Sequence, residues 1–179
     1  MISSPLITAA DAIPLLDQAV FLDARSGPDS TSAYRQSHVA GALRVDLETD
    51  LSEPADPVLG GRHPLPSLRA WLARVGSWGV SPSIPVIVYD AAGGGMAAAR
   101  AWWMLRAIGH EPHSLTMLRE RYARILDDVP VERVVCYCGS GVTACHLLLA
   151  MEACGLSGAQ LYVGSWSEWC RQERPGAAG

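Results

Sequence analysis

The sequence predicts an α/β fold, with a mostly parallel sheet that is flanked by helices on both faces. Runs rich in β-branched residues alternate with segments whose apolar residues recur at helical spacing. Polar and charged residues stand at the ends of several runs, where open α/β sheets place their sites. A strand, a glycine-containing loop and a helix also occur in succession twice. These observations define the class of fold and leave the order of the strands open.

Each expected element has a local reason. Strands are expected where β-branched runs end in glycine or polar turns, and helices where apolar spacing ends at glycine. In the N-terminal part they are a helix over 8–16 with Pro14 near its end, a strand over 19–25, a polar helix over 32–37, a long connection over 46–67, a helix over 68–78, a strand over 84–90 and a helix over 96–108. The C-terminal part adds a helix over 117–126, a strand over 134–138, a helix from 144 and a strand over 160–163.

Cys138 stands where a predicted strand ends and a Gly-Ser-Gly turn begins. Backbone N–H groups of residues 139–144 and the positive end of the following helix would then surround its sulfur. Such surroundings stabilise the thiolate, which is the reactive form of cysteine. We therefore predict that Cys138 is a nucleophile and that Thr143 caps the helix. The other cysteines of this region, Cys136, Cys145 and Cys154, are expected in the core.

Composition excludes several classes of function. The chain has 179 residues and a net charge of −4, and all fourteen basic residues are arginine, spread singly along it. Nucleic acid is therefore not expected as a partner, and the lack of lysine excludes Schiff-base catalysis. No apolar run is long enough to cross a membrane and no export signal is evident, so no membrane partner is expected. Five cysteines without framework spacing favour reduced thiols and a cytoplasmic location.

Two segments in phase carry a resemblance to a known family. Residues 138–144 read Cys-Gly-Ser-Gly-Val-Thr-Ala, and residues 162–169 read Tyr-Val-Gly-Ser-Trp-Ser-Glu-Trp. They resemble the active-site loop of the rhodanese superfamily, in its 3-mercaptopyruvate sulfurtransferase form, and the segment after the catalytic helix. Residues 23–25 and 38–42 are similar to motifs of the first half of a rhodanese domain. Thiosulfate-preferring members typically have basic residues at the two positions that follow the cysteine.

The resemblance implies a group of residues around the nucleophile. In the family, an acidic residue and a histidine of the long connection join the loop serine in a serine-protease-like relay beside the cysteine. By position these residues would be Glu48, His63 and Ser140, with Asp46 as a competing acid. It also implies that the loop binds the donor and its sulfur through Gly139, Gly141, Val142 and Thr143. No metal or organic cofactor is implied.

The resemblance divides the chain into residues 1–116, a rhodanese-like domain with an inactive loop, and residues 117–179, the C-terminal half of a catalytic domain. In the inactive loop Asp90 takes the place of the nucleophile and cannot carry a sulfane sulfur. The first half of the second domain is missing. We therefore expect the strands over 134–138 and 160–163 to join the first sheet, within one chain or in a homodimer.

The arginines that the family's second domain supplies for the donor carboxylate are missing as well. Arg25, Arg62 and Arg100 are the nearest substitutes by motif position. Arg25 is the preferred one, because it ends a strand in the Asp-x-Arg setting.

The predicted function is sulfur transfer. Cys138 would take sulfane sulfur from 3-mercaptopyruvate or thiosulfate as a persulfide and pass it to cyanide or to a thiol, such as a small thiol or thioredoxin. The alternative is a non-catalytic sulfur-relay or binding module, left incomplete by the missing half-domain. A Cys phosphatase or arsenate reductase is disfavoured, because these enzymes need an arginine where this chain has Ala144.

Overall fold

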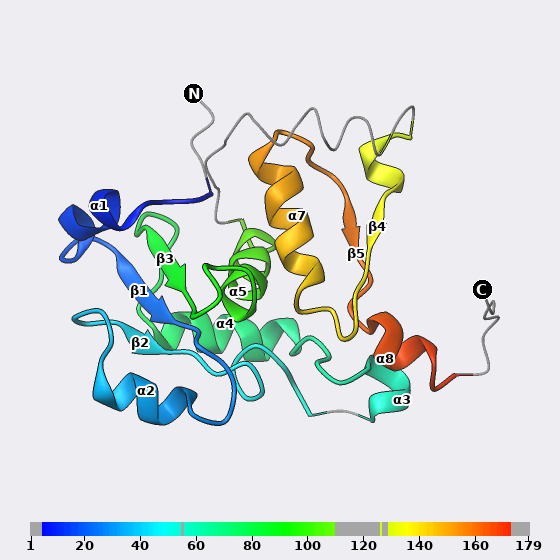
Figure 1. The fold of residues 1–179 in the computed structure, drawn as a ribbon, viewed down its shortest axis with the longest axis horizontal. Coiled ribbons are helices and arrows are strands. Elements are labelled where there is room, and N and C mark those ends of the chain that lie inside the picture. The colour runs from blue at the N-terminus through cyan, green and yellow to red at the C-terminus, as the bar shows by residue number, and fades with distance from the viewer. Residues whose placement is uncertain (1–4, 55, 110–125, 127–128, 173–179) are drawn as a thin grey trace.

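The computed structural model describes residues 5–54, 56–109, 126 and 129–172. They form two sheets, each made of parallel strands, with helices around them (Figure 1). We call residues 5–109 the first unit and residues 126–172 the second unit. Both combine parallel strands with helices, which confirms the predicted α/β fold. The boundary predicted between residues 116 and 117 lies outside the described residues, as does the helix predicted over 117–126 except for its last residue.

The first sheet has its most buried strand at its centre. Its order is β2-β1-β3, with β1 (Val20–Asp23), β2 (Leu43–Arg44) and β3 (Val86–Tyr89). Both neighbours run parallel to β1, and Leu22 lies opposite Leu43 on one side and Val88 on the other. A central parallel strand is covered on both faces, so apolar side chains fill most of it, and Phe21 and Leu22 are both buried. The predicted strands over 19–25 and 84–90 are confirmed with shorter ends.

Helices of the first unit lie close to their predicted positions. They are α1 (Ala9–Ala12), the 3-10 turn η1 (Ile13–Leu15), α2 (Ser30–Gln36), α3 (Pro57–Gly60), α4 (Leu68–Ser77) and α5 (Ala97–Arg106). Pro14 lies within η1 and has no N–H to donate to the preceding turn, so the helix predicted over 8–16 divides into α1 and η1. The long connection over 46–67 contains α3, which the sequence did not predict. Within the described ranges, every helix is too short or too polar to cross a bilayer.

The core of the first unit lies between β1 and the helices α4 and α5. Leu22 of β1 packs in one cluster with Trp71 of α4 and Met104 of α5. The indole N–H of Trp71 donates to the carbonyl of Met104 at 3.2 Å, so this large ring is buried with its polar group paired. Ser67 caps the start of α4 by accepting from the N–H of Ala70. This packing fixes α5, on which the second unit is built.

The second unit forms its own small sheet. Its elements are η2 (Val131–Arg133), β4 (Val135–Cys136), α7 (Ala144–Ala153), β5 (Gln160–Leu161) and α8 (Ser165–Trp169). The strands β4 and β5 pair in parallel with each other, with Cys136 opposite Leu161, and neither pairs with the first sheet. The expectation that these strands join the first sheet within one chain is therefore wrong. Pairing of two chains stays a prediction.

Contact between helices joins the two units in place of strand pairing. α7 lies between α5 and the small sheet (Figure 1). Its Cys145 and Leu149 pack on Ala99 of α5, and its Leu148 packs in a cluster with Cys136 of β4. A helix that is covered on two sides needs apolar residues around most of its circumference, as the sequence of α7 has.

The loop between β3 and α5 is filled by its own carboxylate. One oxygen of Asp90 accepts from the N–H groups of Ala92 and Gly94 at 2.8 and 2.9 Å, and the other accepts from Met96 and Ala98 at 3.0 and 3.1 Å. These contacts satisfy N–H groups of the loop and of the first turn of α5, which have no partner within the helix. The strand, loop and helix repeat predicted from the sequence therefore exists, with a carboxylate in the position that a thiol has in the second unit.

Replacing Asp90 should destabilise the first unit. Asp90→Ala removes a charged acceptor from four N–H groups, so we expect the free energy of unfolding to fall by about 1 to 3 kcal/mol. Urea unfolding followed by circular dichroism measures this change. Asp29→Ala is the matched control, because Asp29 stands at the N-cap of α2 without a side-chain cap hydrogen bond, and it should change the value by less than about 0.5 kcal/mol. Equal stability of Asp90→Ala and the wild type would contradict the role of Asp90.

Candidate active site

The loop that carries Cys138 runs from β4 to the start of α7 and turns at Gly141. The backbone of Gly141 has a φ of 77°, a conformation that favours glycine. A Cβ atom at this position would lie 2.2 Å from the carbonyl oxygen of Val163. With its backbone so placed, the N–H of Gly141 donates to the sulfur of Cys138 at 3.2 Å. The glycine therefore permits both the turn and a contact with the nucleophile.

Cys138 is half-buried, and hydrogen-bond donors surround its sulfur. Burial by itself raises the pKa of the Cys138 thiol. The hydroxyl of Thr143 and the backbone N–H groups of Ser140, Ala144 and Gly141 outweigh burial and lower the pKa from an ordinary value of 9.0 to about 7. At neutral pH much more of Cys138 is therefore thiolate, the form that reacts, than of an ordinary cysteine.

For two other cysteines of this region, the thiol pKa is raised and not lowered. Burial raises the pKa of Cys136, and it raises the pKa of Cys145 to about 12. Both are core residues, as predicted, and Cys154 is buried as well. Only Cys138 among these thiols is prepared to react as an anion.

Thr143 stabilises the thiolate of the nucleophile and does not cap the helix. It stands at the N-cap position of α7, but its side chain makes no cap hydrogen bond. Its hydroxyl instead lowers the pKa of the Cys138 thiol. The predicted capping role is therefore wrong, since the Thr143 oxygen accepts no N–H of the first turn of α7.

The second sequence motif supports the backbone of the loop. Ser165 is fully buried and has a φ of 48°, and its hydroxyl oxygen accepts from the N–H of Cys138 at 3.2 Å. The N–H of Trp166 donates to the carbonyl of Cys138 at 3.0 Å, and the N–H of Ser167 donates to the carbonyl of Gly139 at 2.8 Å. The two motifs occur together in the sequence because one carries the nucleophile and the other holds its backbone in place. The role of Ser165 could not be read from the sequence, since a strained serine has no local pattern.

The first unit supplies the opposite wall of the site, and this wall includes Arg62 and His63. A Cβ on Gly61 would lie 2.6 Å from the carbonyl oxygen of Gly164 and 2.8 Å from the hydroxyl of Ser167. The N–H of Arg62 donates to the hydroxyl oxygen of Ser167 at 3.2 Å. The close approach of backbone at Gly61 therefore brings the predicted histidine segment against the catalytic loop.

His63 is buried and held on two sides. Its Nε2 lies 2.9 Å from Oε1 of Glu48, and its carbonyl accepts from the fully buried guanidinium of Arg100 at 2.8 Å. Asp46 is engaged elsewhere, with Arg44 at 3.1 Å. The structure thus places Glu48, and not Asp46, against the histidine. Nδ1 of His63 is buried and has no hydrogen-bond partner among the described residues.

A cleft of about 610 Å³ lies between the Cys138 loop and this wall. The predicted site residues that line it are Cys138, Gly139, Ser140, Val142, Thr143, His63 and Glu48. Arg62 also lines it, with Nη2 3.4 Å from the hydroxyl oxygen of Ser140. Within the described residues no hydrogen bond joins His63 to Ser140. The members of the predicted relay therefore share one cleft, and only the acid and the histidine are bonded to each other.

Arg25 does not line this cleft. Its guanidinium binds both oxygens of Asp23, at distances down to 2.6 Å, and the carbonyl of Ser37. Asp23 is fully buried, which raises its pKa, but hydrogen bonds from Arg25 and Tyr89 outweigh burial and lower it. A buried carboxylate needs a cation beside it, so Arg25 is committed to Asp23. Donor binding by Arg25 stays an untested prediction, and among the described residues Arg62 is the arginine that lines the cleft.

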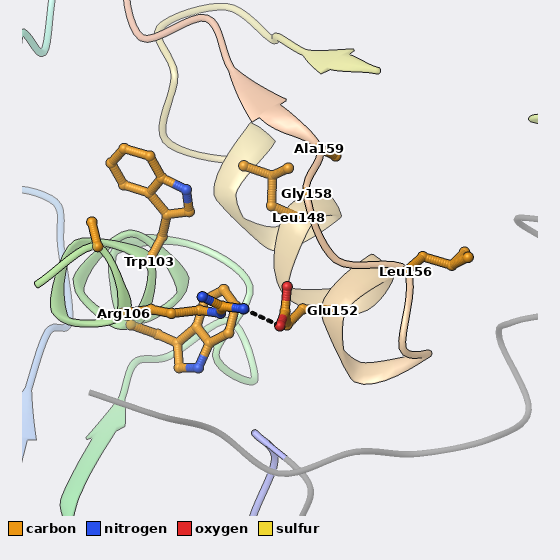
Figure 2. Close-up of a pocket in the computed structure, with 9 residues that line it drawn as sticks. Trp103, Arg106, Leu148, Glu152, Leu156, Gly158 and Ala159 are labelled. Carbon is orange, nitrogen blue, oxygen red and sulfur yellow. Dashed lines mark hydrogen bonds and ion pairs between the residues drawn. The ribbon is translucent and has the colours of Figure 1, made fainter. Parts of the chain in front are cut away.

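A second pocket, of about 170 Å³, lies at the junction of α5 and α7 (Figure 2). Trp103 and Arg106 of α5 line it from one side, and Leu148 and Glu152 of α7 line it from the other. Arg106 and Glu152 form an ion pair across the junction. None of the lining residues is a cysteine or a histidine, so the cleft beside Cys138 is the better candidate for chemistry. Among the described residues, no three His, Cys, Asp or Glu side chains are grouped as metal ligands.

Comparisons with known sequences point to one family. Residues 8–119 match the family described as "Rhodanese-like domain". A probable 3-mercaptopyruvate sulfurtransferase of Pseudomonas aeruginosa is 26% identical, and the alignment covers 100% of both chains. That alignment runs over 284 positions, whereas this chain has 179 residues, so long gaps open in this chain. A putative thiosulfate sulfurtransferase of Mycobacterium tuberculosis is 43% identical over 108 residues, which are 58% of this chain and 35% of that protein.

Solved structures of similar proteins agree on the fold. The 3-mercaptopyruvate sulfurtransferase from Leishmania major superposes with a TM-score of 0.75 at 20% identity, over 91% of this chain and 73% of that chain. The Tum1 protein from Saccharomyces cerevisiae gives a TM-score of 0.65 at 13% identity, over 97% of this chain and 96% of that chain. At these identities the likeness concerns the rhodanese-like α/β fold.

The pH dependence of Cys138 reactivity should depend on Thr143. In the wild type, the rate of alkylation by iodoacetamide should rise with pH through about 7, where the thiolate forms, and level off above it. Thr143→Val removes the hydroxyl donor, so the midpoint should move toward the ordinary thiol pKa and the rate below pH 7 should fall by about three- to ten-fold. The exposed Cys170 is replaced by Ser in all variants.

Thr143→Ser is the control, because it keeps the hydroxyl and should keep the wild-type midpoint. A midpoint that is the same in Thr143→Val and the wild type would show that this hydroxyl does not stabilise the thiolate.

Proposed function

Because this chain belongs to the family of rhodanese-like domains, we propose that it is a sulfurtransferase that carries sulfane sulfur as a persulfide on Cys138. The observation that carries the proposal is a half-buried thiol with a pKa of about 7, set in backbone N–H groups at the side of a cleft. The names of the relatives, a 3-mercaptopyruvate and a thiosulfate sulfurtransferase, support sulfur transfer in general.

The first half of the reaction loads the enzyme. With 3-mercaptopyruvate, the Cys138 thiolate attacks the donor sulfur, an S–S bond forms and the C–S bond breaks. The electron pair of the C–S bond remains on carbon as the enolate of pyruvate, and the donor's thiol proton is transferred to that carbon. The products are a persulfide anion and pyruvate, so no external oxidant or reductant is needed. The N–H groups of Ser140, Gly141 and Ala144, which now face the thiolate, stabilise the anionic sulfur.

The second half returns the enzyme to its starting state. A thiolate acceptor attacks the outer sulfur of the persulfide, a new S–S bond forms, and the Cys138 thiolate leaves. The half-buried position of Cys138 keeps the sulfur within reach of a small thiol or of an exposed cysteine on a protein of the thioredoxin type. This is covalent catalysis with two separate transfers.

We assign to the polar groups of the cleft the transfer of a proton to the enolate carbon of pyruvate. The hydroxyl of Ser140 lines the cleft two residues after the nucleophile, and His63 stands in the same cleft with its Nε2 on Glu48. A general acid of this kind accelerates a reaction by about 10²- to 10⁴-fold. Because Gly139 and Ser140 carry no charge, the loop attracts a dianion such as thiosulfate weakly. The proposed preference is therefore for 3-mercaptopyruvate.

Loss of the nucleophile should abolish loading. Incubation with 3-mercaptopyruvate should add one sulfur atom to the wild-type protein, seen by intact-mass spectrometry, and Cys138→Ser should stay unmodified because a serine hydroxyl does not ionise near neutral pH. Cys170→Ser, which changes the exposed cysteine, is the control and should load fully. A wild-type protein that takes up no sulfur from either donor would instead favour the non-catalytic binding module.

His63 should matter more with 3-mercaptopyruvate, whose leaving carbon takes up a proton during loading, than with thiosulfate. His63→Ala should lower kcat/KM for 3-mercaptopyruvate by about ten-fold or more, and it should lower kcat/KM for thiosulfate less, because sulfite leaves without a proton. His38→Ala is the control, since His38 is exposed and stacks on Tyr34 outside the cleft. Equal losses with both donors would assign His63 a structural role.

A further inference from the structure

We propose that Arg100 is a positioning residue of the active site. Its buried guanidinium holds the long connection that carries Glu48 and His63, and its positive charge acts on the nucleophile's loop from inside the protein. The inference deepens the proposed function and rests on it only for the effect on turnover. Its basis is a fully buried cation without a carboxylate partner among the described residues, the backbone groups that this cation binds, and the packing of α5 on α7.

Arg100 is a charged side chain in the interior of the first unit. It belongs to α5 and is 0% exposed. Within the described part of the chain, no carboxylate lies within ion-pair distance of it. Taking a cation out of water costs free energy, and an arginine is almost never fully buried without a partner. Packing alone would favour an apolar residue at this position, so the charge itself has a role.

The guanidinium holds two parts of the long connection against α5. Its Nε donates to the carbonyl of Leu51 at 3.1 Å, and its Nη2 donates to the carbonyls of His63 and Pro64 at 2.8 and 3.4 Å. Glu48 lies three residues before Leu51, and its Oε1 meets Nε2 of His63 at 2.9 Å. The donors of a guanidinium have fixed directions in one plane, so they hold both parts of the connection at a set distance. Arg100 thereby positions the acid and the histidine relative to each other.

Charge also links Arg100 to the nucleophile. Ala99, the preceding residue of α5, packs on Cys145 in the first turn of α7. Burial lowers the pKa of Arg100, and the anions of Cys145, Cys138 and Glu48 raise it. With a pKa of about 12, Cys145 is neutral near pH 7, which leaves Cys138 and Glu48 as the anions that this cation attracts. Because the attraction is mutual, the guanidinium favours the thiolate and the persulfide anion of Cys138.

Alkylation by iodoacetamide tests the effect of the charge without requiring sulfur transfer. In a Cys170→Ser background, Arg100→Gln removes the charge and keeps a donor for the backbone carbonyls. The midpoint for Cys138, at about 7 with Arg100 in place, should rise by about 0.5 to 1 pH unit, because a nearby cation favours the thiolate. The rate below pH 7 should therefore fall by about three- to ten-fold. An unchanged midpoint in Arg100→Gln would overturn the inference.

Two controls make the alkylation result specific. Arg69→Gln removes the same charge from an exposed position on α4, and it should leave the midpoint unchanged. Intact-mass spectrometry should find a single alkyl group on each variant, because the other cysteines stay buried in a native fold. The other charged or titratable groups around the loop are the same in all variants: Asp46, Glu48, Arg62 and His63 of the cleft, Cys145 of α7 and Glu168 of α8.

A measurement on the protein with Arg100 in place decides the question even if Arg100→Gln fails to fold. The Cys138 midpoint should change by less than about 0.2 pH unit between low salt and about 1 M salt, because dissolved ions screen a buried charge only weakly. A midpoint that rises further in high salt would show that exposed charges, such as that of Arg62, hold the thiolate. That result would overturn the electrostatic role of Arg100.

Steady-state kinetics with 3-mercaptopyruvate test the positioning role. They are measured about two pH units above the midpoint, so that Cys138 is thiolate in every variant. Arg100→Gln should lower kcat by about ten- to a hundred-fold and change KM little, because the acid and the histidine are no longer held in place. In a His63→Ala background the same substitution should lower kcat by less than about three-fold, since no histidine is left to position.

Losses that multiply in the double variant would contradict the positioning of His63 by Arg100. If the wild-type protein transfers no sulfur, the proposed function fails, and the alkylation midpoint still decides whether the buried charge acts on Cys138.

Discussion

The structure depends on backbone N–H groups that gather where a parallel strand turns into a helix, because such a group of donors needs an anion. The first unit meets this need with the carboxylate of Asp90, which accepts four hydrogen bonds and fills its loop. The second unit meets it with the thiolate of Cys138. The same local geometry is therefore a structural element in one unit and a reactive centre in the other. The difference between them is the residue at the end of the strand.

The reactive centre is complete only where the two units meet. The loop, its glycine turn and the supporting Ser165 belong to the second unit, whereas His63 and Arg62 belong to the first. They come together because Gly61 has no side chain and allows backbone to approach the carbonyl of Gly164. The buried Arg100 then donates to the carbonyls of His63 and Pro64 in the adjoining turn and to the carbonyl of Leu51. A site assembled in this way depends on backbone contacts as much as on the functional side chains.

The sequence predicted those features that local pattern controls. β1 and α4 follow from their periodicity, and Cys138 follows because a strand end and a glycine turn define where its sulfur lies. Features that depend on distant partners were missed. Arg25 is bound to the buried Asp23, and the side chain of Thr143 makes no cap hydrogen bond at the start of α7. The contact of Glu48 with His63 is the one that the sequence predicted, with Asp46 as the competing acid. The separate sheet was missed because strands of two residues are placed by the packing of α7, which strand pattern does not report.

The position of α7 also bears on how the chain folds. A sheet of two such short strands has too little buried surface to be stable alone, so the second unit depends on α5 for one wall of its core. The first unit must then form before the second can, and the two are expected to unfold in one cooperative transition. Until α7 docks, the N–H groups around Cys138 are not gathered and the thiol keeps its ordinary acidity. An unfinished chain is thereby protected from oxidation at the cysteine that the folded protein makes most reactive.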